Sequence, residues 1–460
     1  TPLYSSAASD VYKRQKRDWP QPVKQTPPPA LSPQIKTVAT KQAAPCCGLL
    51  VRAHAQATMS PSPTPTTYSR HAHIDALRGI AVFGILLVNV FSFIWGFNAL
   101  RYGVLPANAS LFDILSVAFV AFFAEQKFYP IFAFLFGASF VLITRSATQK
   151  LGRWSDAELL YRRRMKWLLA CGVVHGTLIW FGDILTVYAI AGFWVLSGLA
   201  NARLRRVRKH LYVWLSIFTA LLLLNVFFGT QLFSSDDLIA QSKNEVYAVE
   251  AARTIYTYGG YVGIAIQRIR DYVAVTTQSV FILPHIAVLF LLGVVAVRRG
   301  WLTQPWRHTT FWRRVRLFGF AIGIPFNLIW ATLVLAEAID PLHPSPYSYI
   351  AYAWLPVGGS CLAAAYVACL MLAGSGTQRW LADWMAPVGR MALSNYLMQS
   401  LLCSVLIQGF GFGLGATWPP AGWMMIAFGI MVLQLLLSRW WLSTHCLLYT
   451  SPSPRDKRQS

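Results

Sequence analysis

Residues 76–95 read ALRGIAVFGILLVNVFSFIW, a run in which Arg78 is the one charged residue. A helix of about twenty apolar residues is long enough to cross the roughly 30 Å hydrocarbon core of a bilayer. Similar apolar blocks recur along the chain, separated by short basic links. They are 128–144, 166–181, 184–200, 211–229, 279–297, 317–337, 348–373, 391–408 and 421–441. We therefore predict an all-α, polytopic transmembrane helix bundle of about ten spans.

The composition points to the same class of protein. The chain of 460 residues is 55% hydrophobic and 12% charged, with a mean hydropathy of +0.46. Soluble proteins are about a quarter charged. A net charge of +23 would suggest a nucleic-acid partner in a soluble protein. Here the basic residues gather between apolar blocks, so we expect the lipid bilayer as partner and no nucleic acid.

The basic links also predict an orientation. The stretch 111–124 is short and carries Asp113, so we expect an interfacial or re-entrant helix there. If it does not cross, the most basic links fall on one side with Arg70 and Arg78, and both termini are cytoplasmic. These links are 145–166, 203–210, 298–316 and 379–390. If 111–124 does cross, there are eleven spans and the N-terminus changes side.

The chain divides into two predicted membrane halves, 59–230 and 279–445. The segment 231–278 between them faces outward in the ten-span arrangement. From Asp237 to Tyr272 its apolar residues have helical spacing. We predict an extracytoplasmic amphipathic helical loop that lies over the membrane domain, with a plain packed surface helix as the alternative.

Both ends read as foreign to the protein. Residues 5–15 are SSAASDVYKRQ and residues 446–456 are CLLYTSPSPRD. The two strings fit the two orientations of one transposon end with its sequencing adapters, so we exclude them from fold reasoning. We expect residues 446–460 to be adapter-derived and the native C-terminus to be cut near His445. Residues 1–58 combine the other adapter string with translated upstream DNA or a disordered basic tail, and Met59 is a plausible start.

Charged residues at the edge of a span, or polar ones within it, mark functional or structural clusters. Asp75 and Arg78 share a helix face and can pair, or Arg78 can bind an anionic group such as a donor phosphate. His175 lies inside an apolar block, and Asp183 follows at a tight turn where it can orient the imidazole. His285 is a weaker candidate within another block.

Two further groups are candidate substrate-binding residues. Glu125 and Lys127 lie at the predicted outer face, where such side chains usually reach toward water. Arg390, Asn395 and Gln399 belong to a polar stretch at the start of the ninth block. Ser394, Asn395 and Gln399 in this stretch have helical spacing, which also suits hydrogen bonds between helices, and this is the structural alternative. The adjacent Cys46 and Cys47 aside, the cysteines show no metal-ligand spacing, and we expect no metal and no tightly bound cofactor.

Together these motifs resemble the YeiB-like family of bacterial membrane proteins, which carry domain of unknown function 418. The matching pieces are Asp75 to Gly79 with Asn89, Lys127-Phe128 with Leu135 to Gly137, His175 with Gly182 to Leu185, and Gly389-Arg390 with Gln399-Ser400. The resemblance covers roughly residues 74–445 and implies a multi-pass protein of the bacterial cytoplasmic (inner) membrane. Its opening Asp-x-x-Arg-Gly is also similar to that of membrane acyltransferases that use a coenzyme A donor.

These observations leave three functional hypotheses. The first is a membrane acyltransferase that moves an acyl group from cytoplasmic acyl-CoA to an extracytoplasmic glycan or lipid, with His175 and Asp183 as catalytic residues. Asp75, Arg78, Glu125 and Lys127 would bind its substrates, with Arg390, Asn395 and Gln399 as further binding residues. The second is a secondary transporter or permease for a small solute. The third is a membrane protein without turnover. The sequence indicates no oligomeric state.

Overall fold

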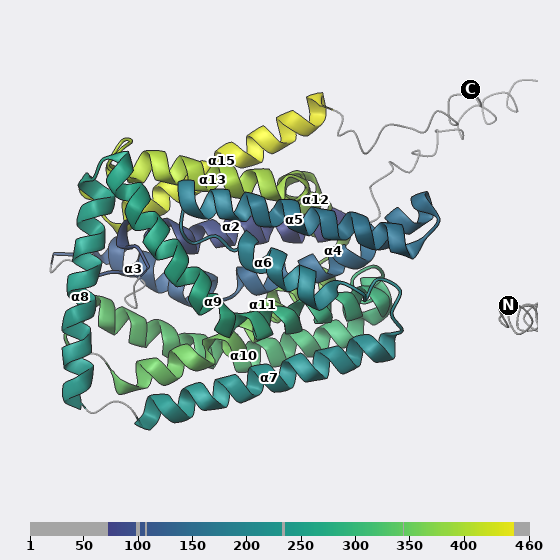
Figure 1. The fold of residues 1–460 in the computed structure, drawn as a ribbon, viewed down its shortest axis with the longest axis horizontal. Helices are drawn as coiled ribbons and strands as arrows, with labels where there is room; N and C mark the ends of the chain where they lie inside the picture. The colour runs from purple at the N-terminus through teal and green to yellow at the C-terminus, as the bar shows by residue number, and fades with distance from the viewer. Residues whose placement is uncertain (1–71, 98–101, 106–107, 232–234, 344, 446–460) are drawn as a thin grey trace, which may run out of the picture. The chain divides into compact units, whose positions relative to one another are not determined.

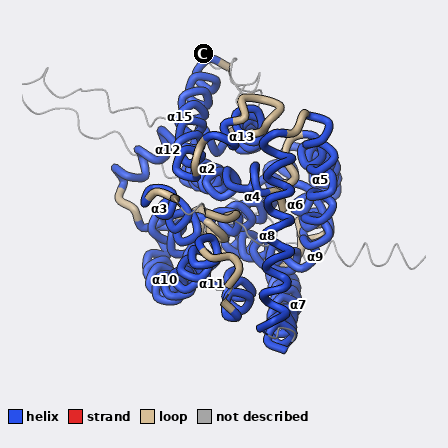
Figure 2. The backbone as a smooth tube through the Cα atoms, turned by 90° about the vertical axis from the view of Figure 1, so that its left-hand side faces the viewer, coloured by secondary structure: helices blue, strands red, loops and turns tan. Residues whose placement is uncertain are grey.

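The computed structural model describes residues 72–97, 102–105, 108–231, 235–343 and 345–445. Within these ranges the chain is helical and contains no strand (Figure 2). The predicted end segments, 1–58 and 446–460, lie outside the described residues. The all-α prediction is therefore confirmed for the part of the chain that the structure describes.

Within the described residues, eight of the nine helices with at least 24 residues form most of the bundle. They are α2 (Ala72–Trp95), α4 (Phe128–Leu151), α5 (Trp154–Leu178), α7 (Leu204–Gln231), α9 (Tyr261–Arg298), α10 (Thr309–Ile339), α11 (Pro346–Leu372) and α15 (Pro420–Thr444). The other helices are α3 (Leu111–Phe119), α6 (Leu185–Ala191), α8 (Ser235–Tyr258), α12 (Ser375–Arg390), α13 (Ala392–Ile407) and α14 (Leu414–Thr417). Single π-helical turns, Val120–Ala124 and Gly192–Leu196, extend α3 and α6, and a 3₁₀ turn, Pro305–His308, precedes α10.

Seven helical stretches of the described residues are long and apolar enough to cross a membrane. They are Ala72–Trp95, Leu111–Leu151, Leu204–Phe227, Tyr261–Arg298, Pro305–Ile339, Tyr347–Leu372 and Pro420–Thr444. Leu185–Leu196 and Ala392–Ile407 are apolar but shorter. Each predicted block falls on a helix, so the chain is a helical membrane protein, whereas the count of ten spans and the side of each terminus stay predictions.

The predicted loop, 231–278, overlaps the end of α7, α8 and the first part of α9. Its predicted end at residue 278 lies inside α9, which runs without a break from Tyr261 to Arg298, so the boundary between the loop and the membrane stays a prediction. The helical spacing of the loop continues directly into the apolar block, and Pro284 is accommodated inside the helix, as membrane helices allow. α8 lies across the ends of other helices and connects to α9 through Gly259 and Gly260 (Figures 1 and 2).

The stretch 111–124 is helical, as α3 and its π turn. Leu111, Phe112 and Leu115 are exposed on one face, whereas Asp113 is 3% exposed. The Asp113 carboxylate accepts hydrogen bonds from the Ser110 hydroxyl, at 2.7 Å, and from the amide of Ala421, at 3.0 Å. The carboxylate therefore caps its own helix and fixes it to the start of α15, which accounts for a charge in an apolar stretch.

Two glycines bring α4 and α9 into close contact. A Cβ at Gly137 would overlap the carbonyl oxygen of Phe290, and a Cβ at Gly293 would overlap that of Phe134. Each glycine thus receives the backbone of the other helix, the way in which small residues allow membrane helices to approach. This contact places the first turns of α4 beside the middle of α9, where the cavity described below is found.

Gly137→Val is expected to destabilise the protein by about 1–3 kcal/mol, since its side chain has no room against the α9 backbone. The measurement is the melting temperature of the purified protein in detergent. Gly429→Val is the matched control, because a Cβ at Gly429 meets nothing within 4 Å. Equal melting temperatures for the two variants would contradict the close α4–α9 contact.

Candidate functional site

The site begins at an irregular turn between α5 and α6. α5 ends at Leu178, α6 begins at Leu185, and residues 179–184 between them are not helical. The Ser404 hydroxyl of α13 donates a hydrogen bond to the carbonyl of Ile179 at 2.8 Å, which supports the turn from the side. Asp183 lies on this turn, close to the first backbone amides of α6.

The carboxylate of Asp183 joins the turn to both helices. One oxygen lies 3.0 Å from Nδ1 of His175 on α5. The other accepts hydrogen bonds from the amide and the hydroxyl of Thr186, each at 2.8 Å. The His175 and Asp183 side chains are 1% and 0% exposed. With the carboxylate ionised, the proton of a neutral imidazole lies on Nδ1, and Nε2 keeps its lone pair.

Nε2 of His175 has no hydrogen-bond partner among the described residues, although it is buried. The imidazole stands beside the ring of Tyr396 on α13, with ring centroids 5.0 Å apart. A buried histidine whose Nδ1 is held by a carboxylate, and whose Nε2 is unused, has the arrangement that a general base requires. The predicted pairing of His175 with Asp183 is thus present in the structure.

Glycines on α5 make this arrangement possible. A Cβ at Gly172 would lie 2.6 Å from the amide nitrogen of Thr186 and 2.7 Å from the Asp183 carboxylate. A Cβ at Gly176 would overlap the ring of Tyr272 on α9. The Tyr272 hydroxyl lies 2.9 Å from the Thr186 hydroxyl, so α9 is also tied to the network. The two glycines therefore provide the space in which Asp183 and Tyr272 reach α5.

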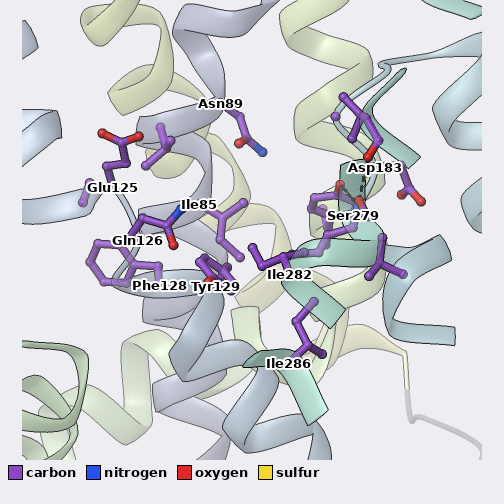
Figure 3. A pocket seen from close by; sticks show the side chains of 17 residues that line it. Ile85, Asn89, Glu125, Gln126, Phe128, Tyr129, Asp183, Ser279, Ile282 and Ile286 are labelled. Carbon is purple, nitrogen blue, oxygen red and sulfur yellow. Dashed lines mark hydrogen bonds between the residues drawn. The ribbon is translucent and has the colours of Figure 1, made fainter. Parts of the chain in front are cut away.

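Asp183 also lines a cavity of ≈ 230 Å³ (Figure 3). The cavity lies between α2, the link from α3 to α4, the Asp183 turn, α9 and α13. Its polar side chains include Asn89, Glu125, Gln126, Asp183, Ser279 and two tyrosines, Tyr129 and Tyr396. We call it the polar cavity. It brings together two predicted site residues, Asp183 and Glu125, that are far apart in the sequence.

The link between α3 and α4 forms the opposite wall. Glu125 is buried and accepts hydrogen bonds from the Tyr102 hydroxyl at 2.9 Å and the Trp330 indole at 2.7 Å. Gln126 has a φ of 60°, which non-glycine residues rarely adopt, and its buried side-chain oxygen has no hydrogen-bond partner within the described chain. A Cβ at Gly359 would overlap the Gln126 carbonyl oxygen. Packing against α11 thus holds a strained residue at the cavity wall.

Lys127 does not line the polar cavity. Its buried ammonium group donates a hydrogen bond to the carbonyl of Ala121, at 2.8 Å, within the π turn. π turns leave backbone carbonyls without their usual helical partner. The structure therefore places Lys127 behind the wall, where it supports the turn that carries Glu125 and Gln126.

Asp75 and Arg78 lie away from the cavity, toward the start of α2. The Arg78 guanidinium is bonded to the Asp75 carboxylate and donates to the Ser139 hydroxyl of α4, at 2.6 Å. Asn89, on the cavity wall, is about 16 Å further along α2 at 1.5 Å per residue. The predicted ion pair is present. Arg78 bonds to Asp75 on its own helix and to Ser139 on α4, and neither Asp75 nor Arg78 lines the polar cavity.

The third predicted group is also separate from the cavity. Arg390 is exposed at the end of α12. Asn395 is buried and its amide donates to the Val388 carbonyl at 3.1 Å and the Ser438 hydroxyl at 3.0 Å. Gln399 is buried one turn further along α13. For Asn395 the structure shows hydrogen bonds to the neighbouring helices α12 and α15, which is the packing role given above as the structural alternative.

His285, the weaker candidate, connects two parts of the bundle. Its Nδ1 lies 2.7 Å from the Tyr129 hydroxyl, and its Nε2 lies 2.9 Å from the Ser360 hydroxyl. Tyr129 belongs to the wall of the polar cavity, whereas Ser360 lines a second cavity described below. Both ring nitrogens are engaged, so His285 links α4, α9 and α11.

Sequence reasoning about the candidate site did not select several cavity residues: Gln126, Tyr129, Ser279 and Tyr396. Asn89 was noted as part of a family motif and not as a site residue, although a polar residue inside a span is a usable signal. The Gly172–Gly176 spacing around His175 was another signal, because small residues four apart mark a close helix contact. Nothing in the sequence predicts the positive φ of Gln126. Among the described residues there is no cluster of three potential metal ligands.

Comparison with known proteins identifies the family. Residues 296–447 match the family described as "Protein of unknown function (DUF418)". The uncharacterized protein YxaH of Bacillus subtilis is 30% identical over 404 residues, which are 84% of this chain and 93% of that protein. The chain belongs to the DUF418 family. The uncharacterized protein YeiB of Escherichia coli is 26% identical over 372 residues, or 74% of this chain and 84% of YeiB.

A third relative is an uncharacterized 39.9 kDa protein encoded in the amylase 3′ region of Bacillus acidopullulyticus. It is 27% identical over 380 residues, which cover 80% of this chain and 88% of that protein. The predicted membership of a YeiB-like family is confirmed. These bacterial relatives and the apolar helices are consistent with a bacterial membrane location.

Asp183→Asn is expected to cost about 3 kcal/mol or more of stability, because a neutral amide cannot accept all three hydrogen bonds from His175 and Thr186. Unfolding in detergent, followed by melting temperature, measures the effect. Asp156→Asn is the control: the same change removes a pair with Arg153 in which the side chains are 36% and 77% exposed, and it should have little effect. Similar losses in both variants would show that the Asp183 network is not a stabilising element.

Proposed function

We propose that this protein is a membrane acyltransferase in which the His175–Asp183 pair activates a hydroxyl group of an acceptor in the polar cavity. The proposal rests on the position of one carboxylate, which makes contact on two sides. Asp183 holds Nδ1 of a buried histidine and also lines the polar cavity. Asp183 and Tyr396 are wall residues of the cavity, and the imidazole of His175 lies behind them, bonded to the one and beside the ring of the other.

The proposed reaction uses Nε2 of His175 as general base. Nε2 takes the proton of the acceptor hydroxyl, and the oxygen of that hydroxyl attacks the carbonyl carbon of an acyl thioester. The C–S bond breaks, and the leaving thiolate receives the same proton from the imidazolium. Asp183 stabilises the positive charge that the ring carries between these two steps. A positioned general base contributes typically 10²–10⁴-fold to the rate.

The cavity wall suits a hydroxylated acceptor such as a glycan. Asn89, Gln126 and Ser279 supply amide and hydroxyl groups that both donate and accept hydrogen bonds. We do not place the phosphates of the acyl donor at Arg78, because its guanidinium already bonds to Asp75 and Ser139. Arg390 is exposed at the end of α12, and Gly389 before it packs on the Asp75 backbone. We therefore assign Arg390 to the phosphates of an acyl-CoA donor.

The proposal includes the ten-span arrangement in the cytoplasmic membrane, with both ends in the cytoplasm. The test is labelling of intact cells with a membrane-impermeant maleimide, in a variant whose native cysteines are replaced. Lys243→Cys, exposed on α8, is expected to be labelled, whereas Arg206→Cys, exposed at the start of α7, is labelled only after cell lysis. The reverse pattern would overturn the orientation.

A secondary transporter is the second candidate, favoured by a separate observation. The backbone is irregular at both walls of the polar cavity, at residues 125–127 and 179–184. Transporters commonly bind solutes where broken helices line a cavity. Uptake of radiolabelled sugars into proteoliposomes under a proton gradient, without any acyl donor, would favour transport.

His175→Ala is expected to abolish acyl transfer in the purified protein, by 10²-fold or more, because the proton acceptor is removed. The assay measures release of free coenzyme A from acetyl-CoA in the presence of a panel of hydroxylated acceptors. His343→Ala is the matched control. It removes a histidine that is also paired with an aspartate, Asp340, but is 76% exposed, so its activity should equal that of the wild type.

Two results would decide against the assignment. If His175→Ala retained wild-type release of coenzyme A, His175 would not be the base. If the wild-type protein released none with any acceptor and instead accumulated solute, the transporter would replace the enzyme as the function of the polar cavity.

A further inference from the structure

A second cavity of ≈ 230 Å³ lies between α4, α9, α10 and α11. Its walls are almost entirely apolar and include Ile131, Phe134, Leu289, Ala364 and Val367, with the Ser360 hydroxyl as an exception. We call it the apolar pocket. An engineered apolar cavity of roughly 150 Å³ is already large enough to bind benzene. The apolar pocket can therefore hold a segment of hydrocarbon chain.

One end of the apolar pocket is built from aromatic rings. Trp301, Phe311 and Trp312 line it, and the rings of Trp301 and Phe311 stack with centroids 4.3 Å apart. The Trp312 indole donates a hydrogen bond to the Trp301 carbonyl at 3.2 Å. Tryptophans of membrane proteins concentrate at the level of the lipid headgroups. The aromatic end is therefore the end from which a lipid would enter.

Exposed arginines flank this aromatic end. On α10, Phe311, Trp312 and Val315 face the apolar pocket. At 100° per residue, Arg314 and Arg316 lie on either side of that face, and both are exposed. Val315, which lies between these arginines on α10, lines the pocket together with Val367 of α11. The arginines thus stand where α10 and α11 border the pocket.

The ends of α4 and α9 add to the same basic region. Arg145, near the end of α4, is exposed, and Arg298 lies at the end of α9. Arg298 itself is engaged, since its guanidinium donates to the Leu199 carbonyl at 2.7 Å. Arg299, next to it, is exposed. Basic pockets between membrane helices bind the headgroups of anionic lipids.

From this juxtaposition we propose that the apolar pocket is a binding site for an anionic phospholipid, one acyl chain of which fills the pocket. The headgroup phosphate lies at the aromatic end, within electrostatic reach of Arg314 and Arg316, which stand about 160° apart around α10. The chain passes Trp301 and Trp312 and extends toward Ser360. The site is distinct from the polar cavity, although the Tyr129–His285–Ser360 hydrogen bonds join the two walls. Bound lipid would thus contact the same polar link that borders the proposed active site.

The test is native mass spectrometry of the full chain in detergent, with increasing amounts of dioleoyl phosphatidylglycerol or dioleoyl phosphatidylcholine. The wild type is expected to retain one phosphatidylglycerol at about a 25-fold lower concentration than phosphatidylcholine. Each basic residue near an anionic headgroup contributes about a five-fold gain in affinity. The double variant Arg314→Gln, Arg316→Gln should therefore bind the two lipids equally. The control Arg162→Gln, Arg163→Gln, on exposed residues of α5, should keep the preference.

The pocket itself is tested by filling it. Ala364→Phe places a ring in the apolar pocket and should abolish retention of the lipid, whereas Ala220→Phe, on an exposed position of α7, should not. Equal retention of both lipids by the wild type, or unchanged retention by Ala364→Phe, would overturn the proposal. If glycerol phosphate displaced the bound lipid as effectively as free phosphatidylglycerol does, the site would bind only the anionic group, and the acyl-chain part of the proposal would be wrong. Displacement by octanoyl-CoA would assign the pocket to the acyl donor instead.

Discussion

The Asp183 carboxylate is the interaction on which the site depends. It accepts hydrogen bonds from the Thr186 amide and hydroxyl and holds Nδ1 of His175, and it does so in a buried turn with no room for a side chain at Gly172. The His175 and Asp183 side chains are 1% and 0% exposed, so their polar groups have to bond to the protein and not to solvent. The α5–α6 turn therefore exists because one carboxylate satisfies both the backbone and the histidine.

The same requirement distributes polar groups along the bundle. Around the polar cavity, Glu125 is held by Tyr102 and Trp330, and Lys127 by a π-turn carbonyl. The wall of the apolar pocket, by contrast, is almost entirely hydrocarbon. Asp183, Glu125 and Lys127 are buried, and each bonds to another helix or turn. The polar groups thus specify packing as well as chemistry.

The sequence predicted which segments are helical, but it did not predict where the helices are interrupted. Hydropathy located every long apolar helix because burial in lipid and burial in protein select the same residues. It did not show that α8 ends at Tyr258 or that one helix, α9, continues from the predicted loop through Pro284, because helical spacing alone does not locate a break between helices. For the site, the motifs predicted the His175–Asp183 pair and included Glu125. They could not show that Lys127 points away from the cavity or that Gln126 adopts a positive φ, since both depend on packing against α11 and the π turn.

A double-mutant cycle on His175 and Asp183 tests the central claim most directly. The free energy of unfolding is measured for His175→Ala, Asp183→Ala and the double variant. Because the side chains are bonded at 3.0 Å in a buried site, the double variant should lose clearly less than the sum of the single losses, by about 1–3 kcal/mol. Strictly additive losses would mean that the two residues do not interact, and the paired site would be contradicted.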